Sequence, residues 1–207
     1  MSDLPVTRNR VSADRESTIR EAVRQADGIP FGTFPSRLAR PEHANAFLDF
    51  LSDPAIHEPI YNLPKPLTAA SVEAFIERKL EARAMGDGLL LLRFDEAGDV
   101  VGYSEFDLWP EWGAGDLGGA LRRDQQGKRE GVNGARQTFN WMFDTLHLEL
   151  IVATGALDNV RTSRMLNGLG FARKGETTNT RPDGSSRQSR VWERTRDAWF
   201  ERQAQAD

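Results

Sequence analysis

From Phe34 onward, the apolar residues of this chain alternate between two spacings, and this alternation limits the fold more than any other feature of the sequence. Apolar residues at every second position indicate strands, whereas apolar residues three or four positions apart indicate helices. Taken in order, the segments predict the element order β-α-α-β-β-β-α-β-α-β-β. This order favours an α+β fold in which helices pack against a mixed sheet.

The predicted elements can be placed by residue number. The strands span 37–40, 89–94, 100–108, 116–121, 148–154, 171–178 and 187–194. One helix starts at Pro41, a second starts at Thr68 or Ser71 and ends at Gly86, and a further one spans 159–169. The longest helical pattern has six apolar residues on one face: Val132, Ala135, Phe139, Met142, Phe143 and Leu146. Such faces supply the predicted core.

The first 30 residues are more polar than the rest of the chain. They contain one predicted helix, 15–26, whose apolar face is thin. We therefore predict an N-terminal arm of residues 1–30 appended to a single domain of residues 31–207, a size that one domain can reach. The arm is a candidate contact for a homodimer.

The composition excludes several kinds of site. The chain has no cysteine, which excludes disulfides, thiolate metal ligands and an acyl-cysteine intermediate. Its three histidines have no HxH or HExxH spacing, so we expect no metal site. The net charge of −4 argues against binding nucleic acid. The sequence shows neither a run of 18 apolar residues nor a signal peptide, and we expect a cytoplasmic protein that binds no membrane.

The loop between the predicted strand 116–121 and the longest helix has the features of an anion site. It is polar, and glycines stand at Gly127 and Gly131, where the helix starts. The first backbone N–H groups of a helix lack partners, and the helix dipole favours negative charge there. Glycines let a pyrophosphate approach the backbone closely. Taken alone, the segment is also compatible with a plain connecting loop.

A second motif follows about 30 residues later, in the segment 157–171. Its spacing resembles the pattern Asn-x-x-Ser-x-x-Leu-Leu-x-x-Leu-Gly-Phe of the GCN5-related N-acetyltransferase (GNAT) superfamily, especially its ribosomal-protein alanine acetyltransferase-like (RimJ/RimL-type) branch. The matching residues are Asn159, Leu166, Leu169, Gly170 and Phe171. The family's cradle, Arg/Gln-x-x-Gly-x-Gly/Ala, is similar to 126–131 except in the middle. The resemblance covers roughly residues 37–199.

The resemblance implies a fold and an activity. The fold is a mixed, mostly antiparallel sheet flanked by helices, with splayed middle strands that form the cleft for acetyl-coenzyme A. The activity is direct transfer of acetyl from acetyl-coenzyme A to a primary amine, either a protein N-terminus or a small molecule, without a metal. The rival interpretation is a non-catalytic module that senses coenzyme A or binds a protein.

The resemblance also implies contacts to the cofactor. Backbone N–H groups of the cradle would hold the pyrophosphate, and the strand ending at Leu121 would pair with the pantetheine arm. The implied cofactor-binding residues are Leu121, Gln126, Gly127, Lys128, Arg129, Gly131, Asn159 and Thr162. Asn159 could equally be a helix cap, and the Thr162 hydroxyl, expected near the leaving thiolate, could instead bond to its own helix backbone.

The reaction needs a neutral amine, which defines the candidate catalytic residues. Neutralising a lysine-like amine at pH 7 costs about 4–5 kcal/mol, whereas an α-amine costs about 1 kcal/mol. Asp116 is our first candidate for a base that acts through water, and Glu105 and Thr162 are the other candidate catalytic residues. The alternative is that these carboxylates lie on an exposed strand face.

Departures from the family pattern support the rival interpretation. Arg129 replaces a motif glycine, Leu166 stands where many relatives have a tyrosine that acts as an acid, and Asp116 is shorter than the common glutamate. His57 and Tyr61 lie in a loop that we expect to shape the acceptor pocket.

Overall fold

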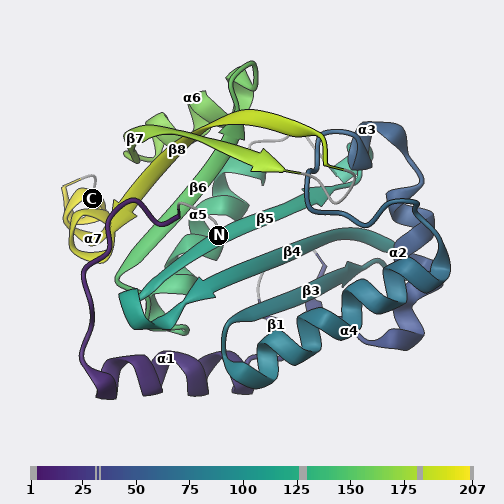
Figure 1. Cartoon of the computed structure of the whole chain (residues 1–207), viewed down its shortest axis with the longest axis horizontal. Coiled ribbons are helices and arrows are strands. Elements are labelled where there is room, and N and C mark those ends of the chain that lie inside the picture. Colours follow the sequence, from purple (N-terminus) through teal and green to yellow (C-terminus); the bar gives the residue numbers. More distant parts are fainter. Residues whose placement is uncertain (1–3, 31, 33, 126–129, 181–183, 206–207) are drawn as a thin grey trace.

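The fold is built on one eight-stranded sheet with the strand order β1-β2-β3-β4-β5-β6-β8-β7 (Figure 1). The computed structural model describes residues 4–30, 32, 34–125, 130–180 and 184–205. The strands are β1 Gly28–Ile29, β2 Ser36–Leu38, β3 Gly88–Phe94, β4 Val100–Trp109, β5 Ala114–Leu121, β6 Leu150–Ala156, β7 Ala172–Thr180 and β8 Ser186–Thr195. The helices are α1 Ala13–Gln25, α2 Ala44–Leu51, α3 Pro54–His57, α4 Ala69–Met85, α5 Glu130–Asp144, α6 Val160–Gly168 and α7 Arg196–Ala204.

This architecture confirms the predicted α+β class and the order of its elements. Three elements were not predicted: the short strand β1, the one-turn helix α3 and the C-terminal helix α7. Helix α7 begins at Thr195, whose hydroxyl accepts a hydrogen bond from the Ala198 N–H, and it buries Trp199. The Trp199 ring contacts those of Phe139 and Phe171, so this helix adds an aromatic side chain to the core beside α5.

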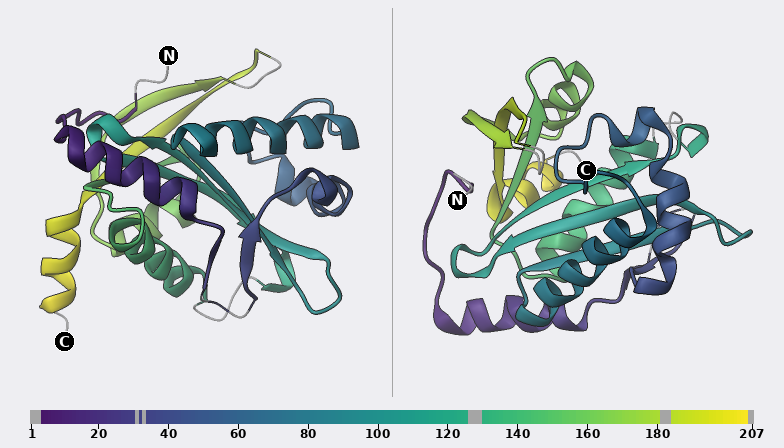
Figure 2. Two further views of the ribbon diagram at one scale, coloured as in Figure 1. Left: turned by 90° about the horizontal axis from the view of Figure 1, so that it is seen from below. Right: turned by 45° about the vertical axis from the view of Figure 1, so that its right-hand side comes forward.

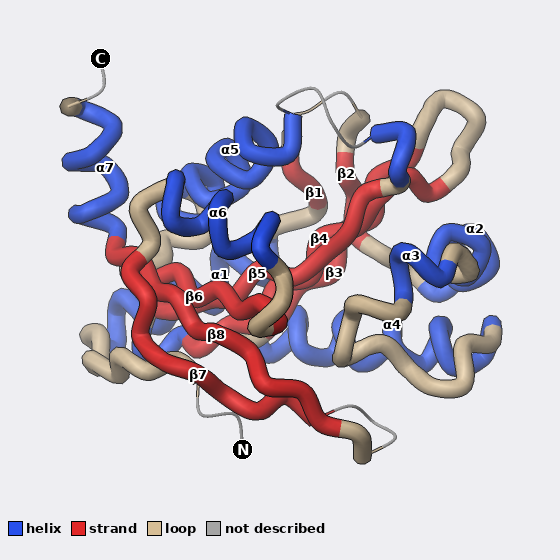
Figure 3. The backbone as a smooth tube through the Cα atoms, turned by 90° about the horizontal axis from the view of Figure 1, so that it is seen from above, coloured by secondary structure: helices blue, strands red, loops and turns tan. Residues whose placement is uncertain are grey.

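Helices cover the two faces of the sheet unequally. One face carries α5, α6 and α7, and the other carries α2, α3 and α4 (Figures 2 and 3). The α5 face holds the larger core, which includes Leu91, Phe106 and Ile151. The α4 face holds a second core around Phe47 and Leu92. Alternate residues of β3 therefore serve different cores, as the twofold spacing of a strand requires.

The strand pair β5–β6 differs from every other strand pair described in the sheet. It is the one parallel pair in that part of the chain, and it joins residues 114–116 to residues 150–152 alone. Strands β4 and β5, by contrast, pair from Ala114 to Leu121. Beyond residue 116, β5 bonds only to β4, and beyond residue 152, β6 bonds only to β8. The facing edges of β5 and β6 thus diverge and no longer pair with each other, in agreement with the predicted splayed strands.

The ends of α4 show how the sequence fixes an element beside the cleft. The Thr68 side chain accepts from the Ser71 N–H, and the Ser71 hydroxyl accepts from the Thr68 N–H. The helix ends at Gly86, whose φ of 82° is left-handed. A Cβ at Gly86 would lie 2.7 Å from the Cα of Arg20, so both the turn and the contact with α1 require glycine.

The predicted helix in the first 30 residues is present as α1. Its Ile19 and Val23 are fully buried in the core on the α5 face, so two apolar residues four positions apart are enough to anchor it. Further upstream, the backbone N–H groups of Val6 and Thr7 donate to the carboxylate of Glu193 on β8. The division into an arm and a domain at residue 30 stays a prediction.

One predicted core residue lies outside the core. Val132, in the first turn of α5, is 41% exposed, because this turn extends beyond the sheet and lines the cleft instead. Across the described residues, the helices are all too short or too polar to cross a membrane.

Candidate active site

A cleft of about 1900 Å³ follows the divergence of β5 and β6. It is lined on the α4 face by residues such as Asn62, Asp107 and Asp116, and on the other side by residues of α5 and α6 such as Asn159 and Thr162. Single ligand sites usually enclose about 300–1,000 Å³. The cleft is therefore larger than a usual site for one small ligand.

Three carboxylates share the α4 face of the sheet. The register of β4 and β5 places Asp107 opposite Asp116, and Glu105 is two residues from Asp107 on the same face. The sequence therefore predicted two residues, Glu105 and Asp116, that the fold brings together. Their environments differ.

Glu105 is held by two partners. Its side chain is buried, the Lys79 Nζ on α4 lies 2.5 Å from Oε1, and the Asn62 Nδ2 donates to Oε2 at 2.6 Å. Lys79 also pairs with Asp107 at 2.6 Å. Burial raises the pKa of Glu105, while Lys79 and Asn62 oppose this shift. Burial alone would lower the pKa of Lys79, but the two carboxylates outweigh burial and raise it.

Asp116 has no such partner. Its Oδ1 is buried and accepts no hydrogen bond in the part of the chain that the structure describes, although the carboxylate lines the cleft. Burial first, and then the charge of Asp107, raise the pKa of Asp116 to about 7, against the backbone N–H of Leu117, which favours the ionised form. A carboxylate with this pKa can take up and release a proton near neutral pH, as a general base does.

Two segments that are distant in sequence meet over the carboxylates on the α4 side of the cleft. The Arg187 side chain on β8 donates from Nη1 to the Pro59 carbonyl at 2.8 Å, and its guanidinium lies 4.1 Å from the centre of the Tyr61 ring. The loop after α3 and the hairpin β7–β8 therefore meet over the α4 side of the cleft. Tyr61 does line this pocket, as predicted, whereas the ring of His57 bonds through Nδ1 to the Leu51 carbonyl at 2.8 Å and has a structural role.

On the cofactor side, some of the predicted residues lie within the described part of the chain. Leu121 is the last residue of β5 and lines the cleft, and Gly131 lies in the first turn of α5. The predicted residues Gln126, Gly127, Lys128 and Arg129 lie outside the described residues.

Asn159 and Thr162 lie together at the start of α6. The Asn159 Oδ1 accepts from the Thr162 N–H at 2.9 Å, so Asn159 is a helix cap. Its amide NH₂ group is not used by this cap. The hydroxyl that bonds back to the helix is that of Ser163, which donates to the Asn159 carbonyl at 3.0 Å. Thr162 lines the cleft, and its hydroxyl bonds to no other described residue.

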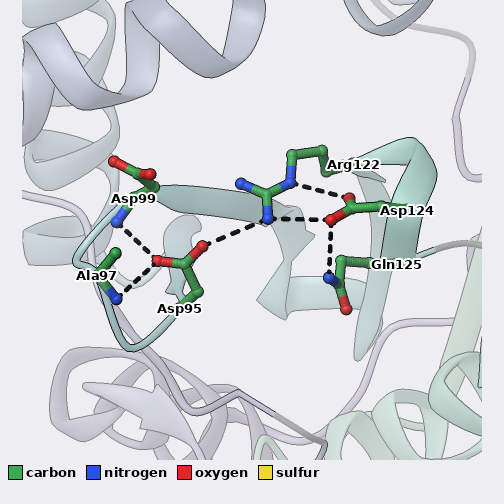
Figure 4. Close-up of polar contacts among 6 residues, drawn as sticks. All are labelled: Asp95, Ala97, Asp99, Arg122, Asp124 and Gln125. Carbon is green, nitrogen blue, oxygen red and sulfur yellow. Dashed lines mark hydrogen bonds and ion pairs between the residues drawn. The ribbon is translucent and has the colours of Figure 1, made fainter.

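The start of the loop that leads to α5 is anchored by Arg122 (Figure 4). Its guanidinium donates to both carboxylate oxygens of Asp124 and to Asp95 in the turn between β3 and β4. Asp95 in turn accepts from the Ala97 and Asp99 N–H groups, which fixes that turn. The guanidinium of Arg122 favours the ionised form and lowers the pKa of Asp124. The chain therefore enters the loop from a fixed position.

These features fit acetyl-coenzyme A. The pantetheine arm is narrow and carries amides, and the edge of β5 that no longer pairs with β6 presents backbone beside the small residues Gly118, Gly119 and Ala120. The α5 N-terminus can favour phosphate, and the Asn159 amide can still donate. Leu166, in the place of the family's tyrosine, is 1% exposed and packs in the core, so it contributes no proton donor.

Four residues in or beside the cleft were not predicted. Lys79 was readable, because it falls on the apolar stripe of α4, three residues after Ile76. Arg93 was also readable as the one charged residue within β3. Asn62 lies in a loop without periodicity, and the Tyr103 hydroxyl, buried without a partner among the described residues, looks like an ordinary core residue in sequence.

Comparisons with known proteins agree with this geometry. Residues 37–172 match the family model described as an acetyltransferase (GNAT) domain. No curated protein matches the sequence.

Solved structures share the fold at low identity. The ribosomal-protein-S5-alanine acetyltransferase from Vibrio fischeri is 18% identical, with a TM-score of 0.68, over 84% of this chain and 99% of that chain. RimL, a ribosomal L7/L12 alpha-N-protein acetyltransferase in complex with coenzyme A, is 18% identical, with a TM-score of 0.70, over 83% of this chain and 99% of that chain. Mycobacterium smegmatis RimJ is 16% identical, with a TM-score of 0.66, over 83% of this chain and 85% of that chain.

Proposed function

Because the chain belongs to the GNAT acetyltransferase family, we propose that it transfers an acetyl group from acetyl-coenzyme A to the α-amino group of a protein or peptide, with Asp116 as the general base. The observation that carries this proposal is the Asp116 carboxylate, which lines the cleft where β5 leaves β6 and lacks a protein partner for its buried Oδ1 among the described residues. Titles of the similar structures, which describe acetyltransferases of ribosomal proteins, support the same class of acceptor.

The pKa of Asp116 matches an α-amine better than a lysine. An α-ammonium group has a pKa near 8, so passing its proton to a carboxylate with a pKa of about 7 costs about 1.4 kcal/mol. The same transfer from a lysine ammonium costs about 4.6 kcal/mol. The site therefore favours N-terminal amines without needing a stronger base.

The other proposed residues position and stabilise. Acetyl-coenzyme A supplies an activated acyl group as a thioester. In the balanced reaction, a C–N bond forms, the C–S bond breaks, the amine loses one proton and the thiol leaves with one. Asp116 takes the amine proton, directly or through water, and this proton passes through solvent to the leaving thiolate, while the Thr162 hydroxyl keeps its proton and donates a hydrogen bond to the sulfur. The Asn159 amide holds the arm, and Glu105, already engaged by Lys79, maintains the shape of the acceptor face.

The test compares acceptors in a thiol-release assay. A peptide with a free N-terminus and no lysine should be acetylated faster than the same peptide with a blocked N-terminus and one lysine, or than a polyamine. The value of kcat/KM should rise with pH through about 7 and flatten above the pKa of the amine. Preference for the lysine peptide or the polyamine would overturn the proposed acceptor.

The same assay tests the rival interpretation. A non-catalytic module that senses coenzyme A would bind it, seen as a higher Tm in its presence, and release no thiol with any amine. Acetyl-coenzyme A at 100 times its Kd should add about 2.7 kcal/mol to the free energy of unfolding in either case. No change in Tm at millimolar concentration would overturn both interpretations.

A further inference from the structure

Arg93 is a half-buried cation that the proposed reaction does not use. It interrupts the apolar run of β3, lies half-buried and lines the cleft. Within the described part of the chain, its guanidinium makes neither a hydrogen bond nor an ion pair. Burial lowers the pKa of Arg93, and no carboxylate offsets this effect. A cation that is half removed from water usually has an anion or a carbonyl beside it, so Arg93 calls for a partner.

The sheet register directs Arg93 to the cofactor side of the cleft. Arg93 pairs with Gly102, which pairs with Leu121, so the three residues form one row on the α5 face. Two strand spacings, about 10 Å, separate the ends of this row. Gly102 has no side chain, and the guanidinium lies flat against Gly32, with Nη1, Cζ and Nη2 all 3.7–3.8 Å from the position a Cβ would take there. Gly32 therefore covers one face of the guanidinium, whose N–H groups have no acceptor among the described residues.

The neighbouring arginine cannot take this role. Arg122, at the start of the loop into α5, is engaged by Asp95 and Asp124 (Figure 4). The same ion pair ties the turn after Arg93 to that loop. The position of Arg93 relative to Arg122 is thus fixed by strand pairing on one side and by the Arg122–Asp95 contact on the other.

We propose that Arg93 binds a phosphate group of the ligand that occupies the α5 side of the cleft, which the proposed function identifies as coenzyme A. The guanidinium is planar and presents several donors, which suits phosphate. The start of α5 borders the same cleft and adds the positive end of a helix dipole. The carboxylates proposed to face the amine, Asp107 and Asp116, lie on the opposite face of the sheet. The site of Arg93 is therefore separate from amine binding.

The test measures coenzyme A binding by calorimetry, independently of turnover. Arg93→Met should weaken the Kd about 10- to 100-fold, the range for losing a hydrogen bond to a charged group, and Arg93→Lys should restore part of it. Arg37→Met is the matched control, because Arg37 is on the adjacent strand but stacks on Phe94 on the opposite face. Arg37→Met should leave the Kd within about twofold.

Truncated ligands identify the phosphate. If Arg93 binds the 3′-phosphate, dephospho-coenzyme A should bind the native protein and Arg93→Met equally. If it binds the pyrophosphate, the difference should persist with dephospho-coenzyme A and vanish with pantetheine. Either pattern supports the proposal. Equal Kd values for coenzyme A in native protein and Arg93→Met, at equal Tm, would overturn it, as would an equal loss in Arg37→Met.

Failure of the proposed function is separable from failure of this inference. If the native protein does not bind coenzyme A, the proposed function fails, and inorganic pyrophosphate becomes the probe for Arg93. Pyrophosphate binding that Arg93→Met abolishes then supports the site. Pyrophosphate binding that is absent, or unchanged in the variant, overturns it.

Discussion

Glu105 and Asp116 are two carboxylates on one face of the sheet, on adjacent strands, and the protein treats them in opposite ways. Glu105 is enclosed by Lys79 and Asn62 and does not line the cleft. Asp116 lines the cleft, and its buried Oδ1 has no partner among the described residues. Burial raises the pKa of both groups. At Glu105 the shift is opposed by direct contacts with Lys79 and Asn62, whereas at Asp116 Lys79 opposes it only as a minor influence, without a hydrogen bond.

The difference separates a structural carboxylate from a reactive one. A buried charge with partners adds little net stability but is costly to break, whereas a buried acid without partners lowers stability when it is ionised. The strand pairing places both carboxylates in the same cluster. Asp116 therefore stays close to the charge of Asp107, which raises its pKa, while Glu105 holds α4 against the sheet through Lys79. Substitutions at each position should therefore produce opposite profiles of activity and stability.

The largest expected effect is the loss of activity in Asp116→Asn. Removing a general base typically costs about 10²- to 10⁴-fold, so kcat in the thiol-release assay should fall by that range. Glu105→Gln, the matched amide change, should reduce kcat far less and lower the free energy of unfolding instead. Native kcat in Asp116→Asn would show that the two carboxylates do not differ in the way described.

The second prediction concerns the pH dependence of stability. Asp116 has a pKa of about 7 in the folded protein and about 3.9 when unfolded, so the folded state holds the proton more tightly. Its ionisation therefore destabilises the fold increasingly as pH rises from about 4 to 7. Asp116→Asn removes this term, so its stability gain over native protein should be near zero at pH 4 and up to about 4 kcal/mol at pH 8.

Urea unfolding at pH 4, 6 and 8 measures this gain. Asp49→Asn makes the same chemical change at an exposed position of α2 and should stay within about 0.5 kcal/mol throughout. If the stability gain of Asp116→Asn over native protein does not grow with pH, the ionised Asp116 carboxylate must be stabilised in the folded protein.

Breaking the ion pair tests the other half of the comparison. Lys79→Met leaves the buried Glu105 without its cation and should lower the free energy of unfolding by about 3 kcal/mol. In the double variant Lys79→Met/Glu105→Gln, part of this loss should return, because no unpaired charge remains. Additive effects in this double-mutant cycle would argue against coupling between the two residues.

The smallest expected effect is that of Asn159→Asp, which places a carboxylate on the cofactor side of the cleft. Asn159→Asp keeps the oxygen that caps α6, so Tm should hardly change. It removes the amide donor and sets a negative charge beside the cofactor arm, which should cost about 1–3 kcal/mol in kcat/KM. Unchanged kcat/KM with unchanged Tm would assign Asn159 to capping alone.

Much of the fold was predictable because its elements are strongly periodic. The sheet strands and α5 follow twofold and 3.6-fold spacing, and the motif around Asn159 fixed the position of α6. Helix α7 was missed because it follows β8 without a break and its cap, Thr195, is the last residue of that strand. Val132 was wrongly placed in the core, because periodicity gives the face of a helix but not where the sheet beneath it ends.

The candidate residues themselves were only partly predictable. Asp116 could be proposed from its place on a strand, but its lack of a partner depends on which residues α4 brings across the sheet. Lys79 and Arg93 each break an apolar pattern, a signal that marks a buried charge without naming its partner. Lys79 and Asp107 are 28 residues apart in the sequence, and Asn62 and Glu105 are 43 residues apart. Such pairs follow from the fold and not from local spacing.

The short ladder between β5 and β6 gives the molecule a seam. Three residue pairs join two parts of the sheet, each with longer ladders of its own. One part contains β1 to β5, and the other contains β6, β8 and β7. Few backbone hydrogen bonds cross this ladder, but the packing does cross it: Ala114 of β5 packs with Leu150 of β6, and Phe106 shares a core with Ile151. Side-chain packing therefore holds the two parts of the sheet together where strand pairing is short. Amide protons along the facing edges beyond the ladder should exchange with solvent before those at the strand centres on either side, and a ligand that bonds to these edges should slow that exchange.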